Sequence, residues 1–157
     1  MPLPQPLDAL LAGLAHAWNK GDGAAWAGHF AEDADFVDVV GRVQRGRAVI
    51  AAEHQKIFDT IYRGSRLTIE HLDSRPLADG LLLVHTTTTL HVPEGTRAGE
   101  WHAIQTKLVR DGQILAFHNS MRMDLADFTH EDEDLARRSP REWRRTGTQD
   151  SQETPSH

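Results

Sequence analysis

The stretch from Phe30 to Gly41 reads FAEDADFVDVVG, and the interpretation of the whole chain starts from it. Its composition predicts a β-strand that contains one carboxylate, Asp38. Successive side chains of a strand point to opposite faces, so Phe36, Asp38 and Val40 should share one face. The opposite face of the predicted strand is equally apolar. Asp38 is therefore expected on a strand that is apolar on both sides.

A carboxylate in such surroundings costs free energy unless it is paired, protonated or exposed to a cavity that holds water or a ligand. Asp38 is accordingly the first candidate for a catalytic group in a pocket. The alternative is a structural carboxylate that accepts hydrogen bonds from a helix terminus, or from an arginine such as Arg42 or Arg45.

Length and composition limit the classes of protein to consider. A chain of 157 residues suffices for one domain with a single core. No segment approaches the ~18 consecutive apolar residues of a membrane span, and no secretory signal is recognisable. The sequence has no cysteine, which excludes disulfides and thiolate chemistry, and a cytoplasmic location is the default expectation. The net charge of −6 comes without a basic stripe, so neither nucleic acid nor a membrane is an expected partner.

Apolar periodicity predicts an α+β domain. Helical spacing is found over residues 7–20, 22–30 and 47–61. Residues 41–44 are expected to form a turn. A two-residue period follows over residues 66–73, 80–92, 100–110 and 113–122, with Asp111-Gly112 as a hairpin turn between the last two. Helices followed by an antiparallel meander indicate an α+β fold.

Three parts of the chain are distinguished by this pattern. Residues 1–6 are an N-terminal extension, residues 7–123 the domain, and residues 124–157 a charged C-terminal tail. In the tail, residues 127–145 are expected to form a short surface helix anchored by Trp143. Residues 146–157 have nothing to bury and are expected to be disordered.

Three segments carry a resemblance to a known family: AWNKGD (17–22), FAEDADFVDVVGRVQRGRAVI (30–50) and AFHNSMR (116–122). Together with the order of the elements, they resemble the NTF2-like superfamily and, within it, the SnoaL-like and SgcJ/EcaC-type proteins. The resemblance implies a cone in which three N-terminal helices pack against a curved, mostly antiparallel sheet. This fold serves isomerases, cyclases, dehydratases and binding modules, so the activity has to be argued from the site.

The ketosteroid isomerases, more distant relatives, imply roles for individual residues. Their general base corresponds to Asp38, and their pocket carboxylic acid, an oxyanion-hole donor, corresponds to Gln105. A supporting pocket tyrosine corresponds to His54. Their oxyanion tyrosine falls at Leu14, a departure that argues against steroid isomerase activity itself.

The pattern of the last strand leaves open which of its faces lines the pocket. The resemblance implies that His118 points inward as a second acid or base, which would leave Asn119 at an interface or on the outer surface. Asn119 is kept as a substrate-binding candidate for the opposite orientation. On the preceding strand, Gln105 and Lys107 share a face, so both point inward unless a β-bulge intervenes or the lysine extends to the rim.

Other candidates each have a structural alternative. His54 lies on the apolar face of its predicted helix, either as an ordinary core histidine or as a partner of Asp38. Trp18 belongs to the core or to the pocket wall, and Trp101 packs across strands or caps a pocket mouth.

Ten histidines invite a metal site, but their spacing does not support one. There is no HExxH, no His-x-His and no pair of histidines four residues apart. The sequence also lacks a nucleophile elbow and a glycine-rich phosphate loop. No metal and no cofactor are therefore expected.

The leading hypothesis is a cofactor-independent isomerase, cyclase or dehydratase that acts on an apolar, ring-bearing molecule with a carbonyl group. Asp38 would remove a proton, His118 or His54 would serve as second acid or base, and Gln105 would hydrogen-bond the enolate. The alternative is a non-catalytic ligand-binding or dimerisation module with the same cone.

Two observations discriminate between these hypotheses. An apolar cavity onto which Asp38 and a histidine converge favours the enzyme, whereas a filled cone or an ion pair between Asp38 and an arginine favours the module. Under both hypotheses a homodimer is expected, because apolar residues on both faces of the last strands exceed what one core can use.

Overall fold

The computed structural model describes residues 5–128 and divides the chain into two compact units, Met1–Met121 and Arg122–His157. The first unit holds every strand and the first three helices of the described part. In the second unit, Leu125–Phe128 forms a short helix, α4. The remainder of the predicted helix over 127–145, with Trp143, and the predicted disordered tail over 146–157 lie outside the described residues.

The three predicted helices are confirmed as α1 (Gln5–Asn19), α2 (Gly23–Ala27) and α3 (Arg47–Phe58). The second and third end three residues earlier than predicted, and Phe30 already begins the first strand. The apolar stripe of α1 is buried, and Leu14 has no exposed surface. Asp22 caps α2, since its carboxylate accepts a hydrogen bond of 2.9 Å from the backbone N–H of Ala25. Within residues 5–128, no helix combines the length and the hydrophobicity that crossing a membrane requires.

The strands form one six-stranded sheet in the order β2-β1-β6-β5-β4-β3. Their bounds are β1 (Phe30–Val37), β2 (Val43–Arg45), β3 (Arg66–Ala78), β4 (Leu81–Val92), β5 (Gly99–Arg110) and β6 (Gln113–Met121). All neighbouring strands are antiparallel except β1 and β6, which run parallel. The predicted α+β cone with a mostly antiparallel sheet is thereby confirmed.

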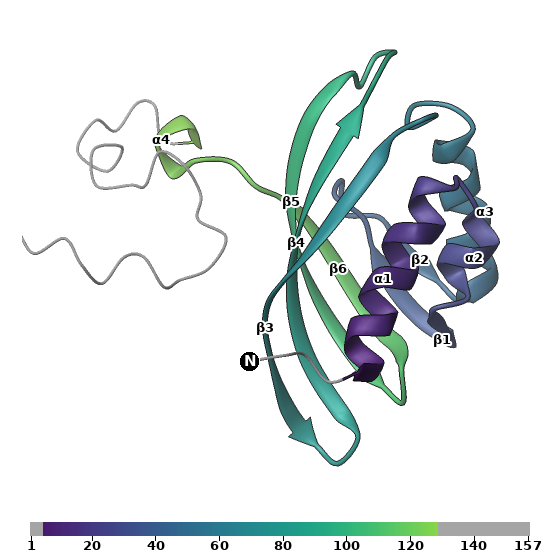
Figure 1. Ribbon diagram of the computed structural model, residues 1–157, viewed down its shortest axis with the longest axis vertical. Coiled ribbons are helices and arrows are strands. Elements are labelled where there is room, and N and C mark those ends of the chain that lie inside the picture. The colour runs from purple at the N-terminus through teal and green to yellow at the C-terminus, as the bar shows by residue number, and fades with distance from the viewer. Residues whose placement is uncertain (1–4, 129–157) are drawn as a thin grey trace, which may run out of the picture. The chain divides into compact units, whose positions relative to one another are not determined.

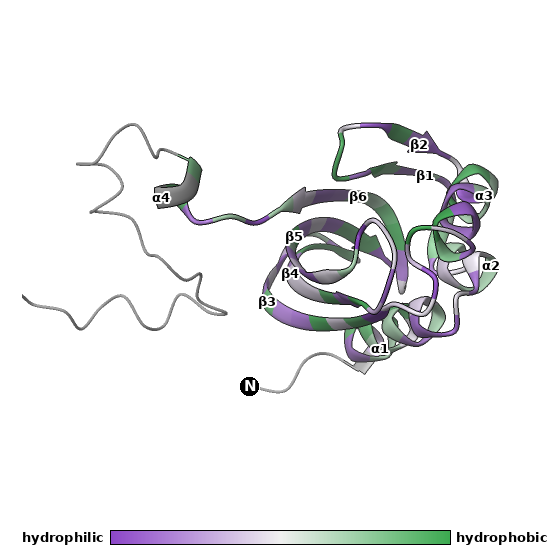
Figure 2. Cartoon of the chain, turned by 90° about the horizontal axis from the view of Figure 1, so that it is seen from above, coloured by the Kyte–Doolittle hydropathy of each residue, from purple (hydrophilic) through white to green (hydrophobic). Residues whose placement is uncertain are grey.

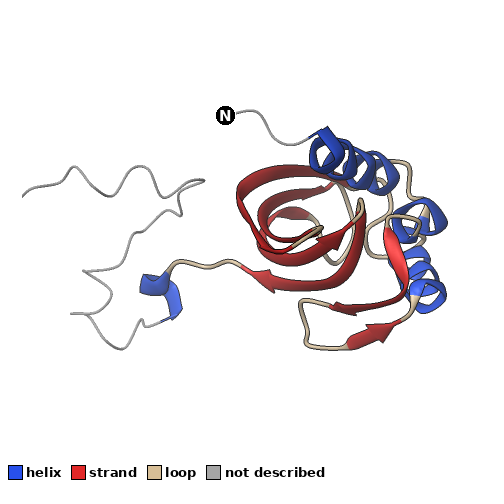
Figure 3. Ribbon diagram, turned by 90° about the horizontal axis from the view of Figure 1, so that it is seen from below, coloured by secondary structure: helices blue, strands red, loops and turns tan. Residues whose placement is uncertain are grey.

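The sheet is strongly curved, and helices α1, α2 and α3 lie on its concave side (Figures 1 and 3). Seen from above, strands β3 to β6 bend around one interior beside the three helices (Figure 2). The hydrophobic core fills part of this space with residues from both layers, such as Leu14 and Trp26 from the helices and Val84 and Ile114 from the sheet.

The structure corrects the predicted position of Asp38. Strand β1 ends at Val37, and Asp38 begins the turn to β2. The Asp38 carboxylate accepts hydrogen bonds from the backbone N–H groups of Val40 (3.1 Å) and Arg42 (2.9 Å), which closes the chain into a turn before the strand can continue. Gly41 adopts the positive φ of 83° that this turn requires. The prediction that residues 41–44 form a turn is correspondingly wrong at its end, because Val43 already belongs to β2.

A one-residue bulge sets the orientation of β6. Next to the hairpin turn, Val109 pairs with Ile114, but the following pair is Leu108 with Ala116, so Leu115 is an extra residue in β6. An uninterrupted hairpin would place His118 opposite Gln105, whereas the bulge places Asn119 there. Shifting the register by one residue exchanges the two faces of a strand.

The expectation that His118 points inward is therefore wrong. His118 is exposed and lies outside the residues that line the cavity, whereas Asn119 lines it. The bulge also weakens the motive for expecting a homodimer. Ile114, Leu115 and Phe117 all pack in or against the same core, so these three do not form two apolar faces, whereas Met121 stays 42% exposed. The dimer itself stays a prediction.

A close contact between α2 and α3 gives a first testable consequence. A Cβ atom on Gly23 would lie 2.5 Å from the carbonyl oxygen of Ala51 and 3.0 Å from the backbone nitrogen of Gln55. We expect Gly23→Ala to lower the free energy of unfolding by about 1–3 kcal/mol, because backbone atoms have to move apart. Chemical denaturation measures the change, with the exposed neighbour Ala24→Ser as control. Equal stability of the two variants would contradict the close packing.

Candidate functional site

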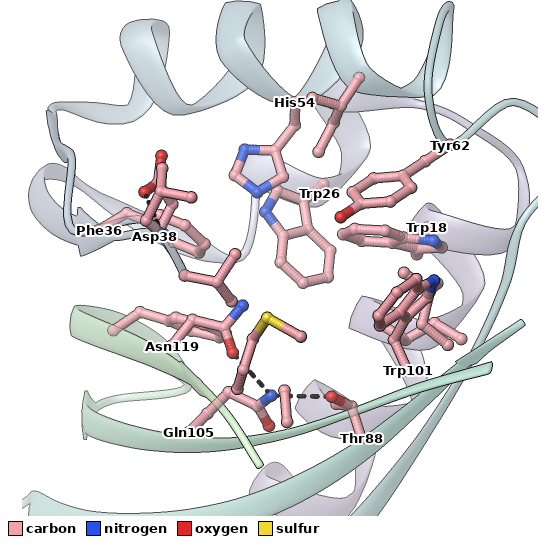
Figure 4. A pocket seen from close by; sticks show the side chains of 18 of the residues that line it. Trp18, Trp26, Phe36, Asp38, His54, Tyr62, Thr88, Trp101, Gln105 and Asn119 are labelled. Carbon is pink, nitrogen blue, oxygen red and sulfur yellow. Dashed lines mark hydrogen bonds between the residues drawn. The ribbon is translucent and has the colours of Figure 1, made fainter. Parts of the chain in front are cut away.

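A cavity of about 390 Å³ opens between the three helices and the concave face of the sheet. Its wall is mainly apolar and aromatic, and Figure 4 shows the side chains that surround it. The aromatic part of the lining consists of Trp18, Trp26, Phe36, Tyr62, Trp101 and Phe117. The cone is therefore not filled by its own core.

The rings of this wall pack against one another and against His54. Phe36 and Phe117 stack with their centroids 4.6 Å apart, and Trp26 stacks on His54 at 5.2 Å. Trp18 packs edge-to-face on Trp26 at 5.4 Å. Such contacts hold flat surfaces in fixed positions, which suits a planar or ring-bearing ligand. Trp18 belongs both to the core and to the pocket wall.

The two tryptophans differ in how their indole N–H groups are satisfied. The N–H of Trp18 donates to the hydroxyl of Ser65 at 2.9 Å. The N–H of Trp26 is buried and has no acceptor among the residues that the structure describes. A buried donor without a partner costs free energy, so this N–H is an unsatisfied polar group next to the cavity.

Gln105 is inside, as predicted, but its hydrogen bonds are already used. Its Nε2 donates to the hydroxyl of Thr88 at 2.9 Å and to Oδ1 of Asn119 at 3.0 Å (Figure 4). Its Oε1 accepts from the hydroxyl of Thr86 at 2.7 Å. Gln105 therefore has no spare N–H for an enolate, and its effect is to orient Asn119.

Asn119 takes the place expected of Gln105. Because its Oδ1 accepts from Gln105, its Nδ2 is the free end of the amide and is turned toward the cavity (Figure 4). The side chain is thus a pre-oriented hydrogen-bond donor.

His54 supplies an acceptor. Only 2% of its surface is exposed, and its Nδ1 lies 2.8 Å from the carbonyl oxygen of Ile50. Since a carbonyl only accepts, Nδ1 carries the proton and Nε2 the lone pair. Burial lowers the pKa of His54 to about 4, against smaller raising effects of that hydrogen bond and of the charges of Asp38 and Glu53. His54 is therefore neutral, and within residues 5–128 its Nε2 has no hydrogen-bond partner.

Lys107 points into the same interior as Gln105. There is no β-bulge between the two residues, and the lysine side chain does not extend to the rim of the cone. Only 1% of its surface is exposed. Its ammonium nitrogen donates to the hydroxyl of Thr86 and lies 4.7 Å over the ring of Phe117. Burial lowers the pKa of Lys107 to about 7.

Asp38 lines the cavity, but as one partner of an ion pair. Nε of Arg42 lies 2.8 Å from its Oδ2, and the Asp38 side chain is only 13% exposed. Burial would raise the pKa of Asp38, but the hydrogen bonds from Arg42 and Val40 and the charge of Arg42 together outweigh it and lower the pKa. Nη1 of Arg42 also lies 3.5 Å from Oε2 of Glu53. No hydrogen bond joins Asp38 to His54 in the described part of the chain.

The structure thus brings Asp38, His54, Gln105, Asn119 and Trp18 to one cavity and excludes His118. Tyr62 was missed, although it follows His54 and Phe58 at a spacing of four residues and so continues their helical face. Its hydroxyl points into the cavity (Figure 4). Among residues 5–128, no three histidine or carboxylate side chains are close enough to hold a metal ion.

Comparisons with known proteins identify a matching domain family and similar solved structures. The family profile of the SnoaL-like domain matches residues 11–117. A domain of unknown function with a cystatin-like fold from Nostoc punctiforme is 30% identical, with 81% of this chain and 82% of that chain covered and a TM-score of 0.73. An uncharacterised protein with the same type of fold from Caulobacter vibrioides is 27% identical, covering 83% and 95% of the two chains at a TM-score of 0.63.

A third solved structure comes from Catenulispora acidiphila. It is a hypothetical protein with a ketosteroid isomerase-like fold in complex with trimethylamine, 17% identical over 75% of this chain and 85% of that one, with a TM-score of 0.57. At this identity the likeness concerns the fold alone. No curated protein matches the sequence.

The hydrogen bonds of Asp38 predict a stability effect. We expect Asp38→Asn to lower the free energy of unfolding by about 1–2 kcal/mol at neutral pH, because the ion pair with Arg42 is lost. The folded pKa lies below the ordinary value of 3.8. The stabilisation of the folded protein by ionised Asp38 is therefore fully present above pH 3.8. It is lost as the pH falls through the pKa of the folded state.

Denaturation of the wild type and the variant between acid and neutral pH measures this difference. The matched control is Asp35→Asn, which removes a similar ion pair with Arg45 between largely exposed side chains and should change stability little. An unchanged or increased stability of Asp38→Asn would contradict a structural role for this carboxylate.

Proposed function

Because the chain belongs to the SnoaL-like domain family, whose fold encloses the cavity described above, we propose that it binds a small, largely apolar, ring-bearing molecule with a carbonyl group. The observation that carries this proposal is the open aromatic cavity of about 390 Å³ with a few inward-facing polar groups. Ligand sites of this size typically combine an apolar wall with a small number of oriented polar groups.

The polar groups suggest the chemistry of the ligand. The N–H group of Asn119 suits an acceptor such as a carbonyl oxygen. The lone pair of His54 Nε2 suits a donor such as a hydroxyl or enol. The stacked rings of the wall suit a flat apolar body. The assignment to the SgcJ/EcaC type, the homodimer and the cytoplasmic location stay predictions from the sequence.

A second candidate function is proton abstraction next to the carbonyl, the step shared by isomerisation, cyclisation and dehydration. It is favoured by Asp38, an ionised carboxylate on the cavity wall. The developing enolate would be met by Asn119 in place of Gln105. The ion pair of Asp38 with Arg42 weakens the carboxylate as a base, which is why binding is placed first.

Ligand binding is tested by titration with 2-acetylnaphthalene, followed by tryptophan fluorescence, because Trp18, Trp26 and Trp101 line the cavity. We expect Asn119→Ala to weaken binding about two- to tenfold, the equivalent of one neutral hydrogen bond. The neighbouring His118→Ala, on the opposite face, should leave it unchanged. For 2-isopropylnaphthalene, which has no carbonyl, both variants should bind like the wild type. Absence of binding, or equal weakening by both variants, would contradict the proposal.

Proton abstraction is tested separately by deuterium exchange of the acetyl protons of the same ketone in heavy water, followed by NMR. If Asp38 is the base, Asp38→Ala should slow the protein-dependent exchange by roughly 10²–10⁴-fold. Asp35→Ala is the control. Exchange that is no faster with wild-type protein than without it would reject the catalytic candidate and leave ligand binding intact.

A further inference from the structure

Lys107 is the one buried ammonium-bearing side chain in the described part of the chain, and neither candidate function uses it. Only 1% of its surface is exposed, yet it lines the cavity. Its contacts are a hydrogen bond to the hydroxyl of Thr86 and the face of the Phe117 ring at 4.7 Å. Among residues 5–128 no carboxylate pairs with it.

Such surroundings disfavour the charged form. One hydroxyl and one aromatic face compensate only part of the hydration that an ammonium group loses on burial. Accordingly, burial lowers the pKa of Lys107 to about 7, which leaves a large share of the side chain as the neutral amine at neutral pH. A neutral amine has the lone pair that makes lysine a nucleophile toward carbonyl compounds.

The hydrogen bonds around Lys107 connect it to the ligand-facing groups. Its amine donates to Thr86, Thr86 donates to Gln105, and Gln105 donates to Asn119. The same row of side chains therefore orients the amine and the amide donor of Asn119. A carbonyl compound in the cavity would meet both a nucleophile and a hydrogen-bond donor for its oxygen.

We propose that Lys107 is a reactive amine of this cavity, which condenses with the carbonyl group of a bound aldehyde or ketone to form a Schiff base. The proposal rests on the proposed function, since it requires the cavity to admit a carbonyl ligand. In the reaction, the lysine nitrogen forms a bond to the carbonyl carbon and the carbon–oxygen bond breaks. The oxygen leaves as water with the two protons of the amine, and no oxidant or reductant takes part.

A Schiff base has a consequence for the proton-transfer chemistry. Once protonated, the imine withdraws electrons from the neighbouring carbon more strongly than the carbonyl it replaces, so an adjacent C–H bond becomes more acidic. A weak base then suffices to remove the proton. This compensates for the low basicity that the ion pair with Arg42 imposes on Asp38.

The experiment traps the imine. Wild-type protein is incubated at pH 7 with 2-naphthaldehyde and sodium cyanoborohydride, which reduces an imine to a stable secondary amine, and the modified peptides are identified by mass spectrometry. The sequence has three lysines, Lys20, Lys56 and Lys107, and the first two are exposed and serve as internal controls. We expect Lys107 to be modified roughly tenfold or more faster than either, because burial holds it in the neutral form.

Two variants check the origin of the reactivity. Lys107→Met should lose the fast modification, while Lys20 and Lys56 react as in the wild type. In the wild type, naphthalene-2-carboxamide, an unreactive compound of the same shape whose binding is measured by tryptophan fluorescence, should suppress the modification of Lys107. Thr86→Val removes the hydrogen-bond acceptor of the ammonium group. It should therefore shift the pH at which modification becomes fast to a lower value, without changing the modification of Lys20 or Lys56.

The outcomes separate the two proposals. Selective modification of Lys107 that the carboxamide suppresses supports the Schiff base. If the carboxamide binds but Lys107 reacts no faster than the exposed lysines, the Schiff-base proposal is overturned and the proposed binding function stands. If the carboxamide does not bind and no selective modification occurs, both are overturned.

Discussion

One extra residue in β6 determines which side chains reach the cavity. Because Leu115 has no partner in β5, the pairing beyond it shifts by one position, and every later residue of β6 changes face. Phe117 and Asn119 consequently line the cavity, while His118 lies outside. The stack of Phe117 on Phe36, the contact of Lys107 with the Phe117 ring and the hydrogen bond from Gln105 to Asn119 all depend on this register.

The ionisable groups that line the cavity are mostly neutral or paired. His54 and Lys107 are both buried, and burial lowers the pKa of each, to about 4 and about 7 respectively. The inner wall therefore presents mostly neutral donors, acceptors and aromatic faces. Charge is kept near Asp38, Arg42 and Glu53, where it is paired.

The carboxylate of Asp38 stabilises a turn and also lines the cavity. Its oxygens accept hydrogen bonds from two backbone N–H groups of the turn between β1 and β2 and from the side chain of Arg42. These bonds keep the group ionised, and the same bonds weaken it as a base. The ion pair of Asp38 with Arg42 favours a binding role for this protein. The open apolar cavity, in contrast, is compatible with catalysis.

Much of the fold could be predicted from the sequence because its causes are local. Helical spacing identified α1, α2 and α3, period two identified β3 to β6, and the segments around Asp38 carried the resemblance to the SnoaL-like proteins. The sequence by itself also placed Gln105 and Lys107 on one face and His54 on a buried stripe. Only the tertiary structure decided that Asp38 begins a turn, that Asn119 and not His118 lines the cavity, and that Lys107 is buried without a carboxylate partner among residues 5–128. The physical reason is that a bulge, an ion pair and the loss of hydration depend on neighbours from other strands, which no local pattern of residues specifies.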